Sequence, residues 1–475
     1  AMDLNLLVIL NDNGMSIDQN VGAISRTLTR ITTSDSYNAI RDEVKRVTGK
    51  VPFGLEILKS LKHMERSVKD FVSPDTAGFF ESLNFRYFGP VQGHNLRELL
   101  PVMAHVRTMR GPILLHVSTV KGKGLGAGIE NTFEAHAVSP ASTKEVNSPP
   151  RKSWTRIYTE GLQDLMARDP AVVALTAAMM SNTGLAPLKE RYPNRVLDVG
   201  IAEANAYCSA AGMAIGGLKP FVTVYSTFSQ RAFDQLIHDI ALQSLPVRIM
   251  MDRGGFVGND GPTHHGVFDH SYLRLIPGMV HMAPRNELEM RRMLLTAWHY
   301  QDGPIAMRYP RGETAAMASE GPLEPIPIGC GELVREGRHA GMLLVAVGSQ
   351  VATALEAAER LEAQGVPCAV VDARFIKPLD ERLLVEQAGA ARAVLTLEEN
   401  VLAGGLGEGL LALLAEHGVQ RPFHMLGAPD RFVSFGSQTD QLRESGLTVP
   451  QVLEAALDLW QAAVRAPSFL RRLQA

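Results

Sequence analysis

Residues 247–266 read VRIMMDRGGFVGNDGPTHHG, an apolar run that leads into a long glycine-rich loop. The run Val247–Met251 is typical of a buried strand. Upstream of it lie the apolar run Phe221–Tyr225 and the helical stretch 230–243, and the small-residue helical stretch 202–217 precedes both. Strands that alternate with helices of this length predict right-handed βαβ crossovers and a parallel sheet.

The same alternation of strands and helices covers most of the 475 residues. Stretches rich in proline and other turn formers interrupt it at 139–150 and 322–327. A chain of this length exceeds a single hydrophobic core, at roughly 150 residues per domain. We therefore predict an α/β protein of three consecutive domains with mainly parallel sheets flanked by helices: residues 1–145, 151–320 and 328–475.

The first predicted domain begins almost directly with an apolar strand, Leu6–Leu10, and a second apolar strand, Ile113–Val120, lies near its end. A long helical stretch separates the two strands. A domain seldom begins with a central strand, so we expect that residues of this domain are missing upstream of Ala1.

Charge and composition exclude several classes of protein. The chain carries 47 Lys and Arg against 50 Asp and Glu, a net charge of −3, which offers no bulk attraction for nucleic acid or a membrane. Hydrophobic residues make up 45%, which excludes a disordered or fibrous protein. No apolar run approaches the roughly 18 residues of a membrane span. The three cysteines form no CxxC pair, so we expect neither a disulfide framework nor a zinc site, and a cytoplasmic location.

The turn Asn11–Ser16 follows the first apolar strand. In parallel α/β sheets, ligands lie at the carboxyl ends of strands, so this turn is well placed for a site. Asn and Asp offer oxygens that suit Mg²⁺, and Gly14 permits a turn that aims a backbone carbonyl at an ion. The alternative is a turn that its own Asn and Asp side chains stabilise and that merely ends the strand.

A carboxyl group, Glu203, falls between the strand pattern Val196–Ile201 and a helix whose face is almost entirely small residues. An acidic residue at that place commonly does no more than favour the helix dipole. Close packing around it would instead desolvate the carboxyl group and tune it as a proton relay.

The densest polar cluster lies in Tyr225–Gln235 and in the loop Asp252–Gly266. Glycines in such a loop allow the backbone to approach a ligand closely, and loops of this kind often carry function. Arg253 and Arg311 would form a forked site for a phosphate, so the set favours a phosphorylated small substrate. For each arginine alone, a surface ion pair is the alternative.

These motifs stand in the order and spacing of the 1-deoxy-D-xylulose-5-phosphate synthases, together with Arg308–Gly312, Arg374–Asp380 and Glu398–Asn400. The chain resembles this family from residue 6 nearly to its C-terminus. The most specific motif is the run Asp252–Gly266, of which transketolases share only the Asp-Gly-Pro-Thr-His portion. The E1 components of pyruvate dehydrogenase are further relatives.

The resemblance implies a thiamine-diphosphate-binding fold with a transketolase-like C-terminal domain. It implies the decarboxylating condensation of pyruvate with D-glyceraldehyde 3-phosphate to 1-deoxy-D-xylulose 5-phosphate and CO₂, a step toward isoprenoid precursors, thiamine and pyridoxal. The implied cofactors are thiamine diphosphate and Mg²⁺, and the implied assembly is a homodimer. The expected location stays cytoplasmic unless a plastid-targeting segment precedes Ala1.

The resemblance also assigns cofactor contacts. Asn13 and the backbone carbonyl of Met15 would be Mg²⁺ ligands. Glu203 would hydrogen-bond the aminopyrimidine ring and promote the form that removes the proton from thiazolium C2. Phe228 would stack on the pyrimidine ring, and Leu125 stands at a cofactor contact where the family has Tyr.

Substrate contacts follow from the same resemblance. The acceptor phosphate would lie among four side chains: Tyr225, Arg231, Arg253 and Arg311. Three further groups would meet substrate hydroxyls or the reacting carbonyl, where proton transfer is needed: Asp260, His264 and His136.

Some residues depart from the family pattern. The Gly-Asp-Gly motif that supplies the other Mg²⁺ ligand in the family occurs nowhere in this chain. Ala204-Asn205 replace the family's Gln-His after the catalytic Glu, and Gln92 and Asn95 stand where Asp is usual. Two alternatives to the synthase therefore stay open: a diverged thiamine-diphosphate-dependent enzyme with another acyl donor or acceptor, and a catalytically dead partner subunit.

Overall fold

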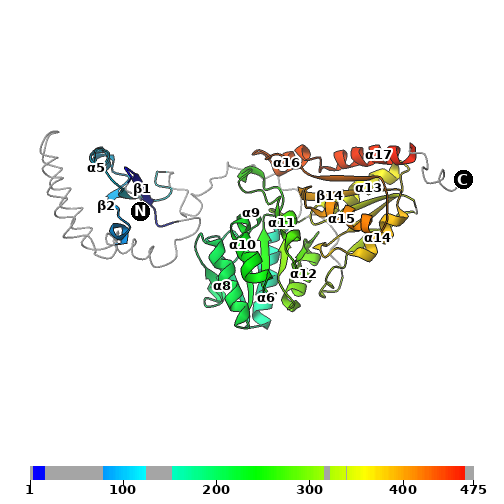
Figure 1. The fold of residues 1–475 in the computed structure, drawn as a ribbon, viewed down its shortest axis with the longest axis horizontal. Coiled ribbons are helices and arrows are strands. Elements are labelled where there is room, and N and C mark those ends of the chain that lie inside the picture. The colour runs from blue at the N-terminus through cyan, green and yellow to red at the C-terminus, as the bar shows by residue number, and fades with distance from the viewer. Residues whose placement is uncertain (1–3, 16–78, 125–151, 315–320, 339, 466–475) are drawn as a thin grey trace. The chain divides into compact units, whose positions relative to one another are not determined.

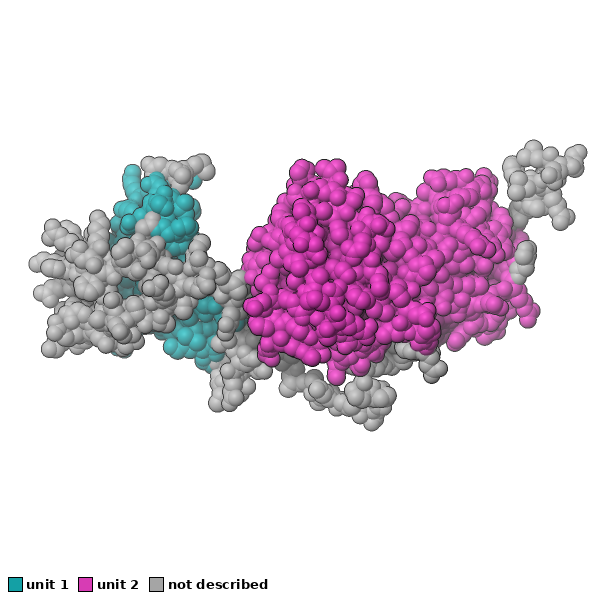
Figure 2. Space-filling model, turned by 90° about the horizontal axis from the view of Figure 1, so that it is seen from below, with its two compact units in different colours: residues 1–145 teal, residues 146–475 magenta. Residues whose placement is uncertain are grey.

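The computed structural model describes residues 4–15, 79–124, 152–314, 321–338 and 340–465. Contacts divide the chain into two compact units, Ala1–Glu145 and Val146–Ala475 (Figure 2). Among the described helices, none combines the length and the apolar character needed to cross a membrane.

The described part of the first unit is a three-stranded parallel sheet. Strand β1 (Leu7–Asp12) pairs with β3 (Ile113–Ser118), which pairs in turn with β2 (Arg86–Gln92). Helix α5 (Leu96–Val106) connects β2 to β3 and packs its apolar face against the sheet. Both strands predicted from apolar runs are confirmed, while most of the helical stretch predicted between them lies outside the described residues.

The second unit contains two sheets (Figure 1). The strands of the larger sheet are β4 (Val172–Thr176), β5 (Val196–Asp198), β6 (Lys219–Tyr225), β7 (Arg248–Asp252), β8 (Val280–Met282), β9 (Ile305–Arg308) and β13 (Phe375–Lys377). Their order is β13-β8-β9-β7-β6-β4-β5, and only the edge strand β13 runs antiparallel to its neighbour. The predicted strands at 221–225 and 247–251 are confirmed as neighbours in this parallel sheet.

Helices connect these strands: α6 (Trp154–Arg168), α7 (Ala186–Arg191), α8 (Glu203–Ile215), α9 (Ser226–Ser229), α11 (Asp269–Leu275) and α12 (Glu287–His299). Apolar side chains of α6 and α12 share one buried cluster with the strands. Ser153 and Asn286 cap these two helices, since each side-chain oxygen accepts a hydrogen bond from a backbone N–H of the first turn.

The prediction of a single helix over 230–243 is wrong. Three short pieces replace it: η2 (Gln230–Ala232), α10 (Phe233–Gln235) and η3 (Leu236–Ala241), the last of which is π-helical. The backbone departs from helical dihedral angles at Ala232, with φ −117° and ψ 23°. A regular α-helix therefore does not continue through this residue. Turns of the π type are rare in proteins and frequent at functional sites.

The smaller sheet has strands β10 (Glu332–Arg335), β11 (Met342–Ala346), β12 (Cys368–Asp372), β14 (Ala393–Val401) and β15 (Phe423–Ala428). Their order is β10-β12-β11-β14-β15, parallel except for β10. The helices that follow or cover them are α13 (Gln350–Ala363), α14 (Glu381–Ala390), α15 (Leu406–Glu416), α16 (Gln438–Glu444) and α17 (Val449–Arg465).

The two faces of this smaller sheet have separate cores. On one face Leu344 and Leu395 pack against α13 and α17. On the other face Leu343 and Val345 pack against α14 and α15. Successive strand residues point to opposite faces, so a strand covered on both sides reads as the continuous apolar run seen in β11.

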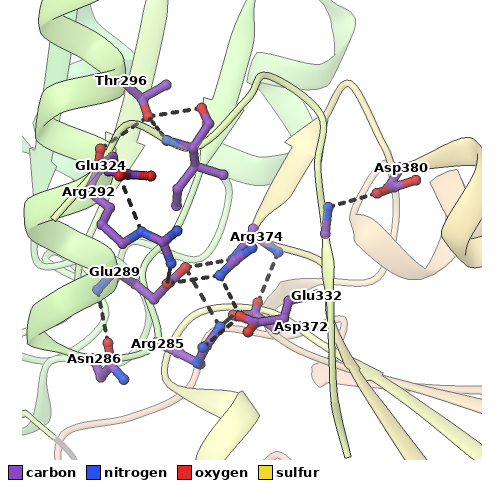
Figure 3. Close-up of polar contacts among 12 residues, drawn as sticks. Arg285, Asn286, Glu289, Arg292, Thr296, Glu324, Glu332, Asp372, Arg374 and Asp380 are labelled. Carbon is purple, nitrogen blue, oxygen red and sulfur yellow. Dashed lines mark hydrogen bonds and ion pairs between the residues drawn. The ribbon is translucent and has the colours of Figure 1, made fainter. Parts of the chain in front are cut away.

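A network of charges, buried except at Glu332, joins α12 to the smaller sheet (Figure 3). Arg374 makes a two-pronged contact with Glu289, Nε to Oε2 at 2.6 Å and Nη2 to Oε1 at 2.9 Å, and it also pairs with Glu332. Arg285 contacts Asp372 at 2.6 Å and Glu332 at 2.7 Å. Burial raises the pKa of Asp372 to about 6, although Arg285 opposes the shift.

Replacing Arg374 tests this network. Arg374→Met leaves the carboxylate of Glu289, whose side chain is fully buried, without its two-pronged partner. The contacts of Glu289 with Arg292 at 3.0 Å and with Arg285 at 3.6 Å remain, so only part of the compensation of this buried charge is lost. Because hydrogen bonds to buried charged groups are costly to break, we expect the free energy of unfolding to fall by about 2 kcal/mol in urea denaturation. The control Arg360→Met breaks only an exposed pair with Glu356 and should cost less than about 1 kcal/mol. Equal losses in the two variants would contradict a structural role for the network.

Candidate active site

The glycine-rich loop 253–266 follows β7 at the carboxyl end of the strand, which is the side of a parallel sheet where ligands bind. Its two ends lie against each other, because the Gly255 N–H donates to the Gly266 carbonyl at 2.7 Å and the reverse bond measures 2.9 Å. The Gly254 N–H donates to the Tyr309 carbonyl after β9. The loop is therefore closed at its base and tied to the sheet.

Two of the loop glycines face buried protein atoms, not open space for a ligand. A Cβ at Gly255 would lie 2.2 Å from Glu399 Oε2, and a Cβ at Gly254 would lie 2.8 Å from Arg308 Nε. Gly255 also has φ +83°, a conformation that side chains disfavour. The sequence interpretation of these glycines as points of ligand approach is therefore wrong at 254 and 255, since charged side chains fill the space beside them.

Those charged side chains hold the loop. Arg308 Nη1 pairs with Asp269 at 2.5 Å and donates to the Gly266 carbonyl at 3.3 Å, while Nη2 donates to the Glu399 carbonyl at 3.0 Å. The Glu399 carboxylate accepts the Phe256 N–H at 3.0 Å. Both side chains come from distant strands, β9 and β14, so the loop's shape is set by tertiary contacts.

The structure brings together five of the predicted substrate residues. The Arg253 guanidinium lies 4.0 Å from the centre of the Tyr225 ring. Arg311 pairs with Asp260 at 2.7 Å. Burial lowers the pKa of His264, and the carboxylate of Asp260 opposes the shift. The charges of Arg253 and Arg311 lower it further, so both act on the same imidazole ring.

Each arginine of this cluster also has a carboxylate partner. Arg253 Nη1 lies 2.9 Å from Asp252 Oδ2, and burial raises the pKa of Asp252. The Arg311 side chain is 42% exposed, so its contact with Asp260 is the surface ion pair that was the alternative interpretation. Such a pair is weak in water and yields readily to a phosphate, which carries more charge than one carboxylate.

The predicted cofactor residues of this unit lie at the ends of β5 and β6. Glu203 is the first residue of α8 and is only 3% exposed, as its small-residue surroundings predicted. Its Oε2 pairs with Nη1 of Arg231 at 3.0 Å, so the structure places Arg231 beside Glu203. Phe228 stacks on Tyr225 at 5.6 Å and meets the edge of His264 at 5.3 Å. The contact of Phe228 with a pyrimidine ring stays a prediction.

In the first unit, the turn after β1 shows the contacts of the alternative interpretation, a turn stabilised by its own Asn and Asp side chains. Oδ1 of Asp12 accepts the Gly14 N–H, and Oδ1 of Asn13 accepts the Met15 N–H, each at 2.9 Å. These are turns stabilised by the strand's own side chains. They also fix Asn13 and leave a further lone pair on its amide oxygen, which is compatible with a cation ligand.

A chain of polar contacts that the sequence interpretation missed lies behind this turn. The Tyr87 hydroxyl contacts His116 Nδ1 at 2.7 Å, and His116 Nε2 contacts Asp12 Oδ2 at 3.2 Å. His116 is fully buried in β3. The available signal was a histidine inside the apolar run Ile113–Ser118, because a buried polar group requires a partner.

Comparison with known proteins assigns the chain to a family. The model of the 1-deoxy-D-xylulose-5-phosphate synthase family matches residues 1–119, the pyrimidine-binding domain of transketolase matches 151–316, and the transketolase C-terminal domain matches 329–452. The 1-deoxy-D-xylulose-5-phosphate synthase of Heliobacterium modesticaldum is 44% identical over 464 residues, which are 96% of this chain and 71% of that protein. Synthase 1 of Geobacter sulfurreducens is 44% identical over 470 residues, 98% of this chain and 73% of that protein.

The chain belongs to the 1-deoxy-D-xylulose-5-phosphate synthase family. It is therefore a thiamine-dependent transferase with a transketolase-like α/β fold, as the resemblance predicted. One similar solved structure is described as a split-gene transketolase, an inactive β4 tetramer, with 29% identity, TM-score 0.58, 65% of this chain and 98% of that chain. Transketolase of Pichia stipitis with sedoheptulose 7-phosphate shares the fold at 17% identity, TM-score 0.54, over 66% of this chain and 47% of that chain.

Two of the residues that the synthase resemblance assigns, Leu125 and His136, lie outside the described residues. Their roles stay predictions. The residues that sequence reasoning missed are those that hold the loop, Arg308 and Glu399 among them. Both stand in motifs that indicated the synthase family, but no local pattern shows that they contact each other across 91 positions.

Beyond the end of loop 253–266, Asp269, His270 and His281 form a buried group whose spacing would suit a metal ion. The contacts favour a different interpretation. His270 Nδ1 and His281 Nε2 hydrogen-bond each other at 2.8 Å, while Asp269 is bonded to Arg308 and Ser226. A cation there would lie beside the Arg308 guanidinium, so we interpret the histidines as a neutral core pair.

Substituting Gly255 tests the packing of the loop. Gly255→Ala forces a Cβ against Glu399 in addition to the strain of a positive φ, whereas Gly278 has φ +70° and open space around it. We expect Gly278→Ala to cost about 1 kcal/mol of unfolding free energy and Gly255→Ala about 2 kcal/mol more. Urea denaturation measures both. Equal costs would show that Glu399 does not constrain this backbone.

The buried histidine pair predicts a loss of stability in acid. Burial lowers the pKa of His281 to about 4 and that of His270 well below its ordinary range. The unfolded chain, with histidine pKa values of about 6.5, binds more protons than the folded chain between pH 6.5 and 4. The unfolding free energy should therefore fall across that window as pH decreases, by about 3 kcal/mol for His281 alone.

The double substitution His270→Leu with His281→Leu should flatten this slope, measured by denaturation from pH 7.5 to 4.5. Near pH 7.5 the slopes of the variant and the wild type should approach each other, because both histidines are then largely neutral in the folded and the unfolded chain. An unchanged slope below pH 6.5 would contradict a neutral buried pair.

Proposed function

We propose that the chain catalyses the decarboxylating condensation of pyruvate with D-glyceraldehyde 3-phosphate, which yields 1-deoxy-D-xylulose 5-phosphate and CO₂. The observation that carries this proposal is the cluster of polar and cationic side chains around loop 253–266, in a chain 44% identical to synthases of this name. The product would supply isoprenoid biosynthesis. The relatives give no support to the two alternatives, a diverged enzyme and a dead partner subunit.

The acceptor phosphate binds between Arg253 and Arg311 in this proposal. Guanidinium groups offer planar, paired donors that match phosphate oxygens. The Tyr225 ring stabilises Arg253 through a cation–π contact, with the guanidinium carbon 4.0 Å from the ring centre. Arg311 exchanges part of its contact with Asp260 for the phosphate, which leaves the Asp260 carboxylate available to a substrate hydroxyl.

His264 serves proton transfer at the reacting carbonyl of the acceptor. Burial lowers the pKa of His264, so the imidazole is neutral near pH 7 and can both accept and donate a proton. The edge contact with Phe228 fixes the ring. His136 is proposed for a similar role on the strength of the resemblance alone.

The residues present fit thiamine diphosphate and Mg²⁺, each considered in its own unit. In the second unit Glu203 offers a buried carboxyl group and Phe228 a half-buried aromatic face, which suit an aminopyrimidine ring. In the first unit the Asn13 amide oxygen and the Met15 carbonyl are the proposed Mg²⁺ ligands, and Leu125 is a proposed cofactor contact. When bound, the cofactor supplies the carbon nucleophile and the electron sink that decarboxylation needs.

The protein is proposed to act as a homodimer in the cytoplasm. Apolar side chains are exposed on the contacting elements α8 and η3 and beside them: Ile201 (54%), Ile215 (66%), Ile237 (38%) and Leu242 (75%). Single exposed apolar residues are ordinary, whereas a group on adjoining elements favours a protein interface. The three free cysteines suit a reducing compartment.

An activity assay with a variant tests the proposal. Purified protein with thiamine diphosphate, Mg²⁺, labelled pyruvate and D-glyceraldehyde 3-phosphate should form 1-deoxy-D-xylulose 5-phosphate, detected by mass spectrometry. Arg311→Met should raise the KM for D-glyceraldehyde 3-phosphate roughly 30-fold, because a charge-assisted contact is lost. The KM for pyruvate should stay unchanged.

The control Arg156→Met removes an exposed arginine that pairs only with Glu160 of its own helix, and it should behave as the wild type. A wild-type protein that forms no deoxyxylulose phosphate would refute the proposed reaction. An Arg311→Met variant with unchanged KM values would refute the phosphate site.

A further inference from the structure

Loop 253–266 is bound along one side by residues 433–441, which lie far away in the sequence. The Gln438 side chain donates to the Phe256 carbonyl at 2.9 Å. His265 Nε2 contacts the Val433 carbonyl at 3.2 Å. The strongest link is Gln441, the fourth residue of α16.

Gln441 pairs with both backbone groups of one loop residue. Its Oε1 accepts the Gly258 N–H at 2.8 Å, and its Nε2 donates to the Gly258 carbonyl at 2.8 Å. Nε2 also donates to the Ser434 carbonyl at 3.0 Å, so both hydrogens of the amide nitrogen are used. The side chain is 1% exposed, and water therefore cannot replace these bonds.

Gly258 is the point at which the loop turns toward the substrate cluster. It has φ +74° and begins the short 3₁₀ turn η4 (Gly258–Asp260). Arg311 Nη1 contacts the Val257 carbonyl at 2.6 Å, directly before Gly258, and Asp260 Oδ2 at 2.7 Å, two residues after it. A shift of Gly258 therefore moves both partners of Arg311.

We infer that Gln441 is a positioning residue for the acceptor phosphate: its amide fixes Gly258 and thereby holds Asp260 and Arg311 where the phosphate binds. The inference rests on the proposed function for the identity of the acceptor. It assigns part of the acceptor's affinity to a residue of the C-terminal region that touches neither substrate nor cofactor. Effective alignment of a bound group is sensitive to small displacements of the residues that hold it.

Two substitutions at Gln441 distinguish the effect of its hydrogen bonds from the effect of its side-chain volume. Gln441→Met keeps the length of the side chain and removes every hydrogen bond to Gly258. Gln441→Glu keeps an acceptor for the Gly258 N–H but places a carboxylate oxygen against the Gly258 and Ser434 carbonyls, so it should act in the same direction. The matched control is Gln451→Met on α17, because the bonds of Gln451 go to Thr448 and Arg443 and not to the loop.

The first measurement needs no cofactor. Amide hydrogen exchange followed by mass spectrometry should show peptides that cover 256–264 exchanging about tenfold faster in both Gln441 variants, because local opening no longer breaks the amide pair. Calorimetric titration with sn-glycerol 3-phosphate, an unreactive phosphate ester, should show a Kd raised on the order of tenfold. Gln451→Met should match the wild type in both.

The second measurement compares two acceptors in the complete assay. In the Gln441 variants, kcat/KM for D-glyceraldehyde 3-phosphate should fall on the order of tenfold, while kcat/KM for unphosphorylated D-glyceraldehyde stays within about twofold. A residue of merely structural importance would reduce both values together, and that result would overturn the inference. Unchanged exchange and an unchanged Kd for glycerol 3-phosphate would overturn it as well.

Failure of the proposed function is distinguishable from failure of the inference. A wild-type protein that makes no product but binds glycerol 3-phosphate more tightly than the Gln441 variants refutes the reaction and supports the positioning role. A wild-type protein that makes product with full phosphate preference in both Gln441 variants refutes the positioning role alone.

Discussion

The buried guanidinium of Arg308 is the contact on which the rest of the site depends. It joins the carboxylate of Asp269 at the start of α11, the carbonyl of Gly266 at the end of the loop and the carbonyl of Glu399 in β14. Arginine keeps its charge at any physiological pH and offers donors in fixed directions. Because three segments share one rigid group, none of them can shift alone, and the loop between them has a defined shape.

The buried contacts of Arg308 specify the conformation of the loop more than they add to the stability of the fold. A buried charged pair loses so much solvation that an apolar replacement of similar volume is often as stable. Arg308 and Glu399 restrict loop 253–266 to one conformation, because all of their hydrogen bonds form only in that conformation. The phosphate site that we propose would gain from such a loop, since a loop held in one shape leaves little ordering to be done when the substrate binds.

The sequence predicted those strands and helices that short-range residue patterns specify. Apolar runs located β1, β3, β6 and β7, and small-residue periodicity located α8, because side-chain alternation and helix periodicity are short-range properties. The same reasoning failed at 230–243, where a break at Ala232 divides a helix that has the right composition. It also gave no sign of β13, a strand of three residues that lies in sequence between β12 and β14 of the smaller sheet but pairs with the larger one.

In the candidate site, too, some residues could be predicted from the sequence and others could not. Residues with distinctive chemistry, such as Arg253 and Glu203, could be singled out by type and by their place after a strand, whereas the role of His264 came from the family resemblance. The residues that hold them could not, because the Phe256–Glu399 and Gly258–Gln441 contacts span 143 and 183 positions. A glycine that a turn requires and a glycine that a buried carboxylate requires look identical in sequence.

We propose that loop 253–266 forms part of a preformed phosphate site that buried contacts hold in place. A crystal structure of the protein with sn-glycerol 3-phosphate tests it most directly. We expect the phosphate within hydrogen-bonding distance of both Arg253 and Arg311, with the contacts of Arg308, Glu399 and Gln441 to the loop unchanged. A phosphate bound elsewhere, or a loop that has broken these contacts to receive it, would contradict the account.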